Sequence, residues 1–418
     1  MIINNNRPYV TDVFTPRKTD VNKNMYVERP ELESELKQAL LGTLHVLVYG
    51  ESGNGKSWLC KKVLADIDTF YITANCANAS RLDSLTEEIV NASIPSGTPT
   101  QNGYSIGNEG EIGIWDFLKS KLSLNKSFNL KMDEPLLAAF KKIRQLAKDK
   151  KAVIIIDNLE AIFNNKKTMT ELADLIILLD DPRYAAYNIK FLIIGVPSGV
   201  LDYFSEIKSS VTVANRLQEI SEVASLSKDQ VNDLTNKGFI DLLKSDIDLG
   251  TFAKWQDHIY LATIGIAQRV HEYCLQLAYI LEQNNWKGTI EDLQIADKKW
   301  LKQGMLKSYQ VISSLMNERE TKTGRRNQVL YALSKTNSRT ISATQIEELV
   351  RAEFVNSTKG VILGISQIMA SDLSGGSNPI IKRTSSKGAD YEFVDPMYLM
   401  CLRVALRKDG ERVFRNEI

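Results

Sequence analysis

The sequence predicts a protein of the α/β class, in which a parallel sheet core is followed by a helical lid and a C-terminal winged helix-turn-helix domain. Three observations predict this fold. Residues 50–57 form a glycine-rich loop between a strand and a helix, and residues 152–157 form an apolar strand that ends in a carboxylate. The part after residue 304 suggests helices followed by a hairpin. Strands that alternate with helices imply a parallel sheet.

Composition and charge set the first limits. The chain has 418 residues, of which 43% are hydrophobic and 25% are charged, as in globular proteins of two or three domains. The net charge of +1 hides an asymmetry, because residues 301–418 carry 18 Lys and Arg against 12 Asp and Glu. This basic end suits either an anionic partner or an ordinary solvated surface.

Several classes of protein are not expected from this composition. The four cysteines show no C-x-x-C spacing and there are only three histidines, which argues against a zinc site or a disulfide framework. The first residues lack the apolar core of a signal peptide, and no run approaches the roughly 18 apolar residues of a membrane span. We therefore expect a cytoplasmic protein without a membrane partner.

Residues 50–57 read Gly-Glu-Ser-Gly-Asn-Gly-Lys-Ser and match G-x-x-x-x-G-K-[ST] at every fixed position. The glycines let several N–H groups point at one centre, Lys56 supplies positive charge for the β- and γ-phosphates, and the Ser57 hydroxyl can bind Mg²⁺. An apolar strand precedes the loop and a helix follows it, as this chemistry requires. The sequence thus predicts a P-loop NTPase core. Its predicted nucleotide-binding residues are Gly50, Ser52, Gly53, Asn54, Gly55, Lys56, Ser57 and Trp58.

The apolar run 152–156 is typical of a central parallel strand that is buried on both faces. Such a strand places Asp157 at the carboxyl edge of the sheet, beside the P-loop, where it helps Ser57 to hold Mg²⁺. The next residue is Asn158, and the next carboxylate is Glu160. Glu160 is either the general base that activates water or a surface acid in a first helical turn. In the second case, hydrolysis is slow or absent.

Three further residues are candidates for contact with a nucleotide, and each has a structural alternative. Ser198, which follows the apolar strand 190–195, either senses the γ-phosphate or belongs to a turn. Arg216 either stabilises phosphate charge on a neighbouring subunit or forms a structural salt bridge. Arg269, near the start of a long helix, either reaches the nucleotide from the lid side or lies at the surface.

The chain divides into four predicted parts. Residues 1–24 are polar and irregular, residues 25–225 form the α/β core, residues 226–303 form the lid, and residues 304–418 form the winged helix domain. Within the core, residues 92–131 are an insertion rich in Ser, Gly, Thr and Pro, with a predicted hairpin. The insertion is either a surface elaboration or a contact for a partner protein or nucleic acid.

The C-terminal part has the element order of a winged helix-turn-helix. Its supposed recognition helix, residues 359–373, contains no charged residue between Gly360 and Ser371 and only Ser366 and Gln367 as longer polar residues. Base reading usually needs Arg, Lys, Asn or Gln. The wing carries Lys382, Arg383 and Lys387, which suit contacts with phosphates. DNA binding and a protein-interaction or packing role therefore both stay open. The helices predicted here are 305–317, 326–335, 343–352 and 359–373, and the strands are 379–384 and 391–394.

In the lid, Ser227 and Gln230 form a predicted capping box, and Gly238 is predicted to end the helix that begins there.

The order of the P-loop, the Asp157 strand, Arg216, Arg269 and a C-terminal winged helix resembles the AAA+ and STAND branch of P-loop ATPases. It looks most like origin-recognition initiators and related prokaryotic ATPases. The resemblance spans roughly residues 25–400 and is strongest at 50–57 and 153–160. It implies ATP and Mg²⁺ as cofactors, a nucleotide bound in part by residues 26–29, and switching between ADP and ATP states that changes oligomerisation.

Carried over by position, Lys56 and Ser57 match the residues that bind phosphate and Mg²⁺, Asp157 matches the Walker B aspartate, and Arg269 matches the lid arginine. Asn158 stands where AAA+ proteins usually have a glutamate, although Asp-x-hydrophobic-Glu is similar to the STAND form. The residues 195–198 lack the common sensor asparagine, and 265–267 lack the usual lid proline. These departures bear on fast hydrolysis more than on binding.

We therefore expect an ATPase that acts as a nucleotide-dependent switch or assembly factor and engages double-stranded DNA through its winged helix. The alternative is a STAND-like signalling or defence ATPase whose C-terminal part binds protein. Either function implies self-association or a partner protein that depends on the nucleotide state. A third possibility is that ATP is bound only structurally.

Overall fold

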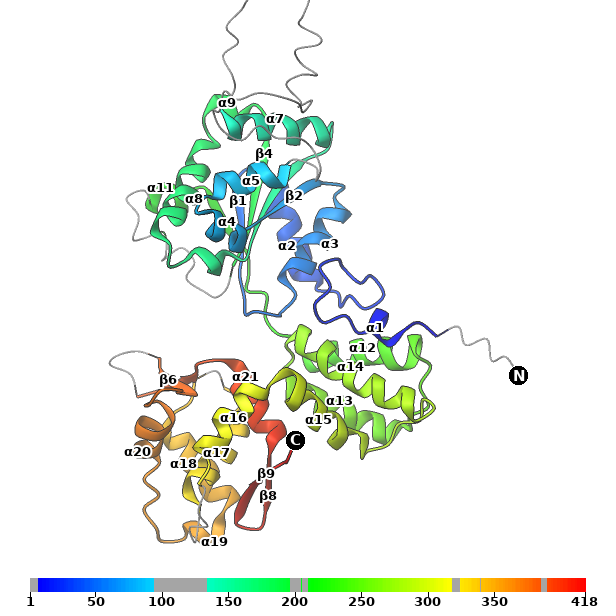
Figure 1. Cartoon of the computed structure of the whole chain (residues 1–418), viewed down its shortest axis with the longest axis vertical. Coiled ribbons are helices and arrows are strands. Elements are labelled where there is room, and N and C mark those ends of the chain that lie inside the picture. Colours follow the sequence, from blue (N-terminus) through cyan, green and yellow to red (C-terminus); the bar gives the residue numbers. More distant parts are fainter. Residues whose placement is uncertain are drawn as a thin grey trace, which may run out of the picture. The chain divides into compact units, whose positions relative to one another are not determined.

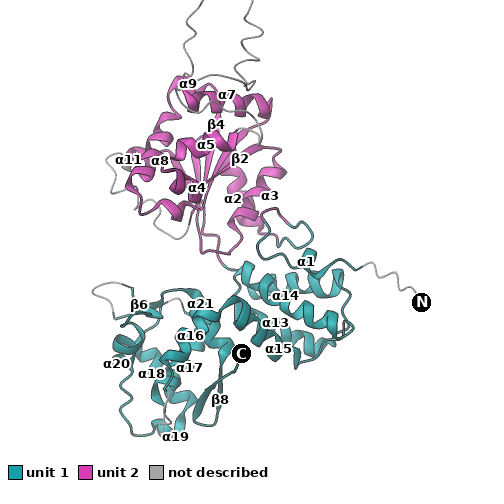
Figure 2. Cartoon of the chain, in the orientation of Figure 1, with its two compact units in different colours: residues 1–18, 22–27, 225–418 teal, residues 19–21, 28–224 magenta. Residues whose placement is uncertain are grey.

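The computed structural model describes residues 7–93, 134–195, 204, 210–317, 324–338, 340–384 and 389–418. The chain forms two compact units, which Figure 2 colours separately. One unit consists of residues 19–21 and 28–224 and contains the sheet. The other, called the second unit below, consists of residues 1–18, 22–27 and 225–418. The predicted hairpin in the insertion 92–131 lies outside the described residues. Among the residues that the structure describes, no helix combines the length and apolar character needed to cross a bilayer.

The described part of unit 28–224 contains a five-stranded sheet with the order β2-β3-β4-β1-β5. Every pairing in it is parallel, which confirms the predicted core. Residues 152–156 of β3 are all buried, as the apolar run predicted. β3 lies between β2 and β4, and both faces of the sheet are covered. The strands are β1 His45–Val48, β2 Phe70–Asn75, β3 Ala152–Asp157, β4 Ile189–Ile194 and β5 Leu217–Glu219.

Helices cover both faces of this sheet (Figure 1). Successive strand residues point to opposite faces, so Ile155 packs against one layer and Ile154 and Ile156 against the other. One layer consists of α2 Pro30–Leu41 and α3 Lys56–Asp66. The other contains α4 Cys76–Leu82, α5 Leu85–Ser93, α7 Pro135–Ala147, the 3₁₀ turn η1 Leu159–Ile162, α8 Lys166–Leu178, α9 Pro182–Ala185 and α11 Ser210–Ala214.

The second unit has one continuous apolar core that joins the lid helices to the winged helix. The boundary predicted at 303/304 therefore separates two parts of one compact unit. The lid helices are α12 Lys228–Thr235, the π-helical turn η2 Asn236–Leu242, α13 Leu249–Thr263, α14 Ala267–Gln283 and α15 Asp292–Gly304.

The N-terminal segment belongs to the core of this second unit, which its polar sequence did not predict. The side chains of Val10, Val13, Phe14 and Met25 are buried in the lid core, where the Phe14 ring lies 4.8 Å from that of Phe239. The short helix α1 Val10–Val13 begins this segment.

The capping box at Ser227 is present, but the prediction that Gly238 ends its helix is wrong. The chain continues from α12 into η2, and a Cβ atom at Gly238 would lie 2.4 Å from the Phe14 ring. This glycine therefore serves close packing of the N-terminal segment rather than the end of a helix.

The C-terminal elements form the predicted winged helix-turn-helix arrangement. The antiparallel hairpin of β6 and β7 follows the helices, and a bridge between Ile341 and Tyr391 extends the small sheet. The predicted helix 359–373 begins only at Ile365, because Gly360 and Gly364 have φ of 68° and 65°, which a helix does not tolerate. The elements are α16 Leu306–Leu315, α17 Arg325–Ser334, α18 Ala343–Glu353, α19 Val355–Thr358, α20 Ile365–Gln367, the π-helical turn η3 Ile368–Leu373, β6 Ile381–Arg383 and β7 Tyr391–Phe393.

The chain then forms α21 Pro396–Ala405 and a second hairpin, β8 Leu406–Asp409 with β9 Arg412–Arg415, which the sequence did not predict.

Candidate functional site

Residues 50–57 connect the end of β1 to the start of α3, so the glycine-rich loop lies at the carboxyl edge of the sheet. Gly50 has a φ of 144°, and a Cβ atom there would lie only 2.4 Å from the carbonyl oxygen of Val223. Only glycine fits this conformation and this close approach. The loop thus packs against Val223, next to the last residue of this unit, Ala224.

The amine of Lys56 is folded over its own loop. Its Nζ donates hydrogen bonds to the carbonyl oxygens of Gly50 at 2.8 Å and Glu51 at 3.0 Å. Burial lowers the pKa of Lys56, and the negative charges of Glu160 and then Asp157 are the main groups that oppose this shift. The two carbonyl contacts are the kind of interaction that a phosphate oxygen can replace with a stronger, charge-assisted hydrogen bond.

The side chains of Ser57, on α3, and Asp157, at the end of β3, contact each other. The Ser57 hydroxyl donates to Oδ2 of Asp157 at 3.3 Å, and the backbone N–H of Asn158 donates to Oδ1 at 2.9 Å. Two half-buried oxygen groups at this spacing are the hard ligands that Mg²⁺ prefers. These residues therefore fit a magnesium site of the kind that keeps several waters and phosphate oxygens as its other ligands.

Glu160 is the second residue of η1, and its side chain is exposed. Of the negative charges that oppose the lowering of the Lys56 pKa, that of Glu160 has the largest effect, ahead of Asp157. The Glu160 carboxylate therefore lies within electrostatic reach of the Lys56 amine. Glu160 also contributes, after Asp157, to the raised pKa of the buried Cys76 thiol, for which desolvation is the main cause. The two carboxylates and Lys56 thus belong to one group of charges at the carboxyl edge of the sheet.

The protein family described as AAA domain matches residues 41–204. This part of the chain is an AAA domain. The match confirms the predicted AAA+ P-loop family and includes the loop, β3 and Glu160. A search of the curated proteins finds no match to the chain.

Solved structures resemble most of the chain at low sequence identity. The Walker-type ATPase of Pyrococcus abyssi has a TM-score of 0.50 and 15% identity, over 94% of this chain and 99% of that chain. The ORC2 protein of Aeropyrum pernix in its ADPNP–ADP complexes has a TM-score of 0.48 and 13% identity, over 90% and 91% of the two chains. The Aeropyrum pernix ORC1 protein in complex with DNA has a TM-score of 0.45 and 15% identity, over 94% and 95%. At such low identity, the likeness to the Pyrococcus abyssi protein shows a similar fold and nothing further.

Beside the P-loop, Arg29 and Asn54 contribute contacts that the motif alone did not predict. The Arg29 guanidinium donates to the carbonyl oxygens of Asn54 at 2.9 Å and Ala224 at 2.7 Å. The buried side-chain amide of Asn54 donates to the carbonyl oxygen of Val223 at 3.0 Å. Because residues 223–224 end this unit, the P-loop is connected directly to the point where the chain leaves it. The resemblance implied that residues 26–29 bind the nucleotide, but it did not predict these contacts of Arg29 with the protein backbone.

Asn75 and Glu88 are further polar residues of the AAA domain at this edge. Asn75 ends β2 opposite Asp157 in the parallel register, and its backbone N–H donates to the buried Glu88 carboxylate at 3.0 Å. Its side-chain oxygen accepts from the Asn158 amide at 3.3 Å and from the backbone N–H of Ala77 at 2.8 Å. The sequence signal that could have pointed to Asn75 is its position as a polar residue at the end of an apolar strand.

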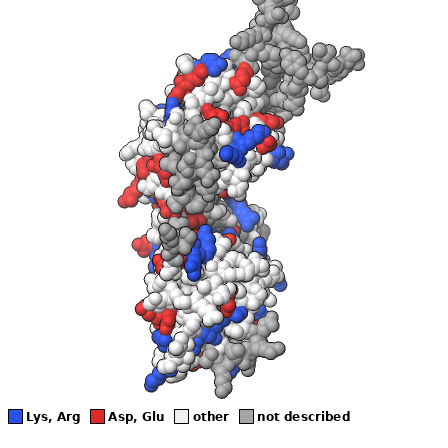
Figure 3. Space-filling model, turned by 90° about the vertical axis from the view of Figure 1, so that its left-hand side faces the viewer, with Lys and Arg blue, Asp and Glu red and all other residues white. Residues whose placement is uncertain are grey.

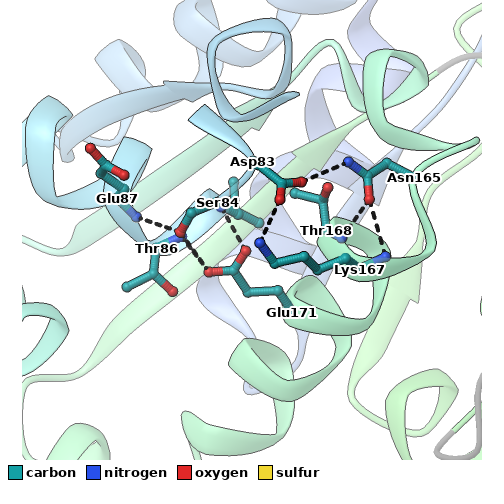
Figure 4. A network of polar contacts seen from close by, with 9 residues as sticks. Asp83, Ser84, Thr86, Glu87, Asn165, Lys167, Thr168 and Glu171 are labelled. Atoms are coloured by element: carbon teal, nitrogen blue, oxygen red, sulfur yellow. Dashed lines mark hydrogen bonds and ion pairs between the residues drawn. The ribbon is translucent and has the colours of Figure 1, made fainter. Parts of the chain in front are cut away.

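A polar network fixes the chain that follows Glu160 in the AAA domain (Figure 4). Asn165 caps α8, and its side-chain amide also donates to Asp83 at 3.2 Å, as does the amine of Lys167. From the next turn of α8, Glu171 accepts hydrogen bonds from the backbone N–H groups of Leu85 and Thr86 at 2.7 and 2.9 Å. Hydrogen bonds thereby connect the start of α8, the helix after η1, to the start of α5.

Arg216 occupies the opposite edge of the sheet from the P-loop within its own chain. It immediately precedes β5, whose Leu217 pairs with His45 at the start of β1, whereas the P-loop follows the end of β1. Its guanidinium forms an ion pair with Asp180 at 2.6 Å and donates to the carbonyl oxygen of Thr212 at 2.8 Å. The structural salt bridge is therefore present, and a role on a neighbouring subunit stays a prediction.

The remaining predicted residues are placed as follows. Arg269 lies on α14 in the other compact unit, where it donates to Glu272 at 2.7 Å and to the Met397 sulfur at 3.4 Å. Its role as a lid arginine stays a prediction. Trp58 is half-buried on α3, directly after Ser57. Ser198 lies outside the described residues.

Proposed function

We propose that this chain binds ATP with Mg²⁺ at residues 50–57 and hydrolyses it slowly, and that the bound nucleotide sets its assembly state. The observation that carries the proposal is that Lys56 and Ser57 begin α3 at the carboxyl edge of the sheet, where the Ser57 hydroxyl contacts Asp157 at 3.3 Å. In an AAA domain, this edge is where the phosphates of the nucleotide lie.

In the proposed mechanism, the amine of Lys56 exchanges the carbonyl oxygens of Gly50 and Glu51 for β- and γ-phosphate oxygens. Ser57 and Asp157 would hold Mg²⁺, which would neutralise phosphate charge when bound. Glu160 accepts a proton from the water that attacks the γ-phosphorus. The bond from the γ-phosphorus to the bridging oxygen breaks, and ADP and phosphate leave.

Two substitutions test this site. Lys56→Ala should weaken ATP binding by about 10- to 100-fold, because one charge-assisted hydrogen-bond donor is lost. Glu160→Gln should bind ATP normally and release no phosphate above background. Lys166→Ala and Glu87→Gln, both at exposed positions of the same unit, are matched controls. Normal phosphate release by Glu160→Gln would remove Glu160 from the role of base, and unaltered behaviour of Lys56→Ala would favour a purely structural nucleotide.

We further propose that the winged helix engages double-stranded DNA in one nucleotide state. Support comes from the basic C-terminal part and from the wing residues Lys382 and Arg383, both of which are exposed. Lys382 also pairs with Glu392 at 3.1 Å, and the two signs of charge are interspersed over the face in Figure 3. Contacts from these residues would be made with phosphates and not with bases.

A protein partner is the second candidate, as in a STAND-like signalling or defence ATPase. It is favoured by a run of exposed apolar side chains beside the supposed recognition helix. Ile362 is 96% exposed, Val355 60% and Val361 47%, where DNA binding would call for cations. Such side chains suit a protein surface better than a phosphate backbone.

Salt-dependent DNA binding separates the two candidates. For the DNA-binding function, affinity for duplex DNA should fall steeply as salt rises and should drop further in the double variant Lys382→Ala, Arg383→Ala. No binding at low salt, with or without ATP, would exclude it. Mass measurement of the purified protein with ADP, with a non-hydrolysable ATP analogue and with duplex DNA would then show which ligand changes its assembly state. In the same measurement, Arg216→Ala tests the proposed contact with a neighbouring subunit, and Arg269→Ala tests the lid.

A further inference from the structure

The residue that follows Asp157 has an unusual backbone conformation. Asn158 has φ 59° and ψ 45°, in the left-handed region that most L-residues avoid at a cost of roughly 1–2 kcal/mol. Asparagine is one of the few residues other than glycine that adopt it readily. The conformation turns the chain sharply at the end of β3, and η1 begins with the next residue, Leu159.

This turn determines where Glu160 lies. The carbonyl oxygen of Asn158 accepts a hydrogen bond from the backbone N–H of Ala161 at 3.0 Å, which closes the first turn of η1 around Glu160. An extended continuation of β3 would carry residue 160 about 10 Å beyond the end of the strand. With the turn, the Glu160 carboxylate stays within electrostatic reach of Lys56.

The side chain of Asn158 is attached to the neighbouring strand. Its Nδ2 atom donates to Oδ1 of Asn75 at 3.3 Å, and that oxygen also accepts from the backbone N–H of Ala77 at 2.8 Å. Asn75 is itself held by its place in β2 opposite Asp157 and by the contact of its N–H with Glu88. An amide at 158 can donate to Asn75, whereas a carboxylate at this position cannot.

We propose that Asn158, anchored by Asn75, is a positioning residue that places the Glu160 carboxylate for attack by water on the γ-phosphate. The inference rests on the proposed role of Glu160. It gives a physical reason for an amide directly after Asp157: the position supplies the turn and the anchor, and the carboxylate comes two residues later.

The test measures ATP affinity, KM and kcat in full-length variants with Mg²⁺ present. Asn158→Ala should lower kcat by about 10- to 100-fold, as expected for a misplaced catalytic group, with ATP affinity unchanged. Asn158→Gly should recover most of this loss, because glycine adopts the left-handed conformation without strain. Asn75→Ala should also lower kcat with unchanged affinity, by less than Asn158→Ala, because the turn persists without its anchor.

Three results would overturn the proposal. They are a wild-type kcat in both Asn158→Ala and Asn75→Ala, a kcat in Asn158→Gly as low as in Asn158→Ala, or a parallel loss of ATP affinity that marks general damage to the loop. Glu160→Gln keeps the two proposals distinct. If it is inactive while Asn158→Ala is as fast as the wild type, only the positioning role fails. If Glu160→Gln hydrolyses ATP at the wild-type rate, the role of Glu160 fails and the positioning role fails with it.

Discussion

The side-chain amide of Asn54 donates a hydrogen bond to the carbonyl oxygen of Val223 at 3.0 Å, which attaches the P-loop to the last residues of its unit. Arg29 adds a second connection, since one guanidinium contacts both the Asn54 and Ala224 carbonyl oxygens. A loop that moves when a phosphate binds would therefore displace residues 223–224. These contacts give the first prediction.

Asn54→Ala should destabilise the unit 28–224 by about 1–3 kcal/mol, because the Val223 carbonyl loses its side-chain donor in a buried place. Urea unfolding measures the change. Asn91→Ala, at an exposed position on α5, is the matched control and should change the stability by less than about 0.5 kcal/mol. Equal stability of the two variants would show that the contact of Asn54 with Val223 contributes nothing.

Two glycines of the same loop give a matched comparison. Both Gly50 and Gly55 have positive φ, of 144° and 88°, but only at Gly50 would a Cβ atom meet another group, the Val223 carbonyl at 2.4 Å. Gly55→Ala should therefore cost roughly 1–2 kcal/mol from backbone strain alone. Gly50→Ala should cost clearly more in the same unfolding measurement, since the backbone of residue 223 must also move. A smaller loss in Gly50→Ala than in Gly55→Ala would contradict the packing described here.

The sequence predicted well those features that are encoded locally. The P-loop is a contiguous pattern. The apolar run 152–156, which ends at Asp157, predicts a buried strand even when its neighbouring strands are unknown. The contact between Asn75 and Asn158 could not be predicted in the same way. It depends on β2 lying beside β3 in a particular register, and the two residues are 83 positions apart in the chain.

The errors also have physical causes. Gly238 looked like a helix end because glycine is common there, but close packing of Phe14 explains it. Val10, Val13 and Phe14 stand in a polar segment, so their joint burial depends on a lid core formed by residues more than two hundred positions later. Arg216, whose role on a neighbouring subunit stays a prediction, lies at the edge of the sheet away from the P-loop because it directly precedes β5, which pairs with β1 in parallel.

The stability of the sheet unit should depend on pH through His45. Its Nδ1 atom accepts a hydrogen bond from the backbone N–H of Phe191 at 3.2 Å, so the native state needs the neutral ring. Burial, aided by the nearby charge of Lys190, lowers the pKa of His45 to about 4 from its ordinary value of 6.5. The unfolded chain therefore binds more protons between pH 6.5 and pH 4, and stability falls as the pH falls through this window.

The full loss is on the order of 3 kcal/mol, reached near pH 4. Urea unfolding at several pH values measures it, and His45→Gln should flatten the pH dependence of the transition of this unit between pH 4 and pH 6.5. A slope that is the same in His45→Gln and in the wild type would show that other groups cause the acid sensitivity.

Arg403 should hold the lid and the winged helix together as one unit. From α21, its guanidinium donates to the Leu261 carbonyl on α13 at 2.7 Å. It also donates to the carbonyl of Ser334, the last residue of α17, at 3.0 Å and to that of Thr336 at 2.6 Å. Arg403→Ala removes these charged donors and should destabilise the unit by about 2–4 kcal/mol. Lysine cannot reproduce the fork of donors, so Arg403→Lys should recover only part of this loss. Arg407→Ala, at an exposed position on β8, is the control.

The comparison also tests whether the winged helix follows the lid. If Arg403 connects them, hydrogen exchange in Arg403→Ala should rise together at the end of α13 and at the end of α17, because both ends lose the same donor. Arg407→Ala should leave exchange at both ends unchanged. Faster exchange at α17 alone would show that Arg403 serves the winged helix and not its connection to the lid. A nucleotide-driven movement of the lid would then leave the winged helix free to move separately.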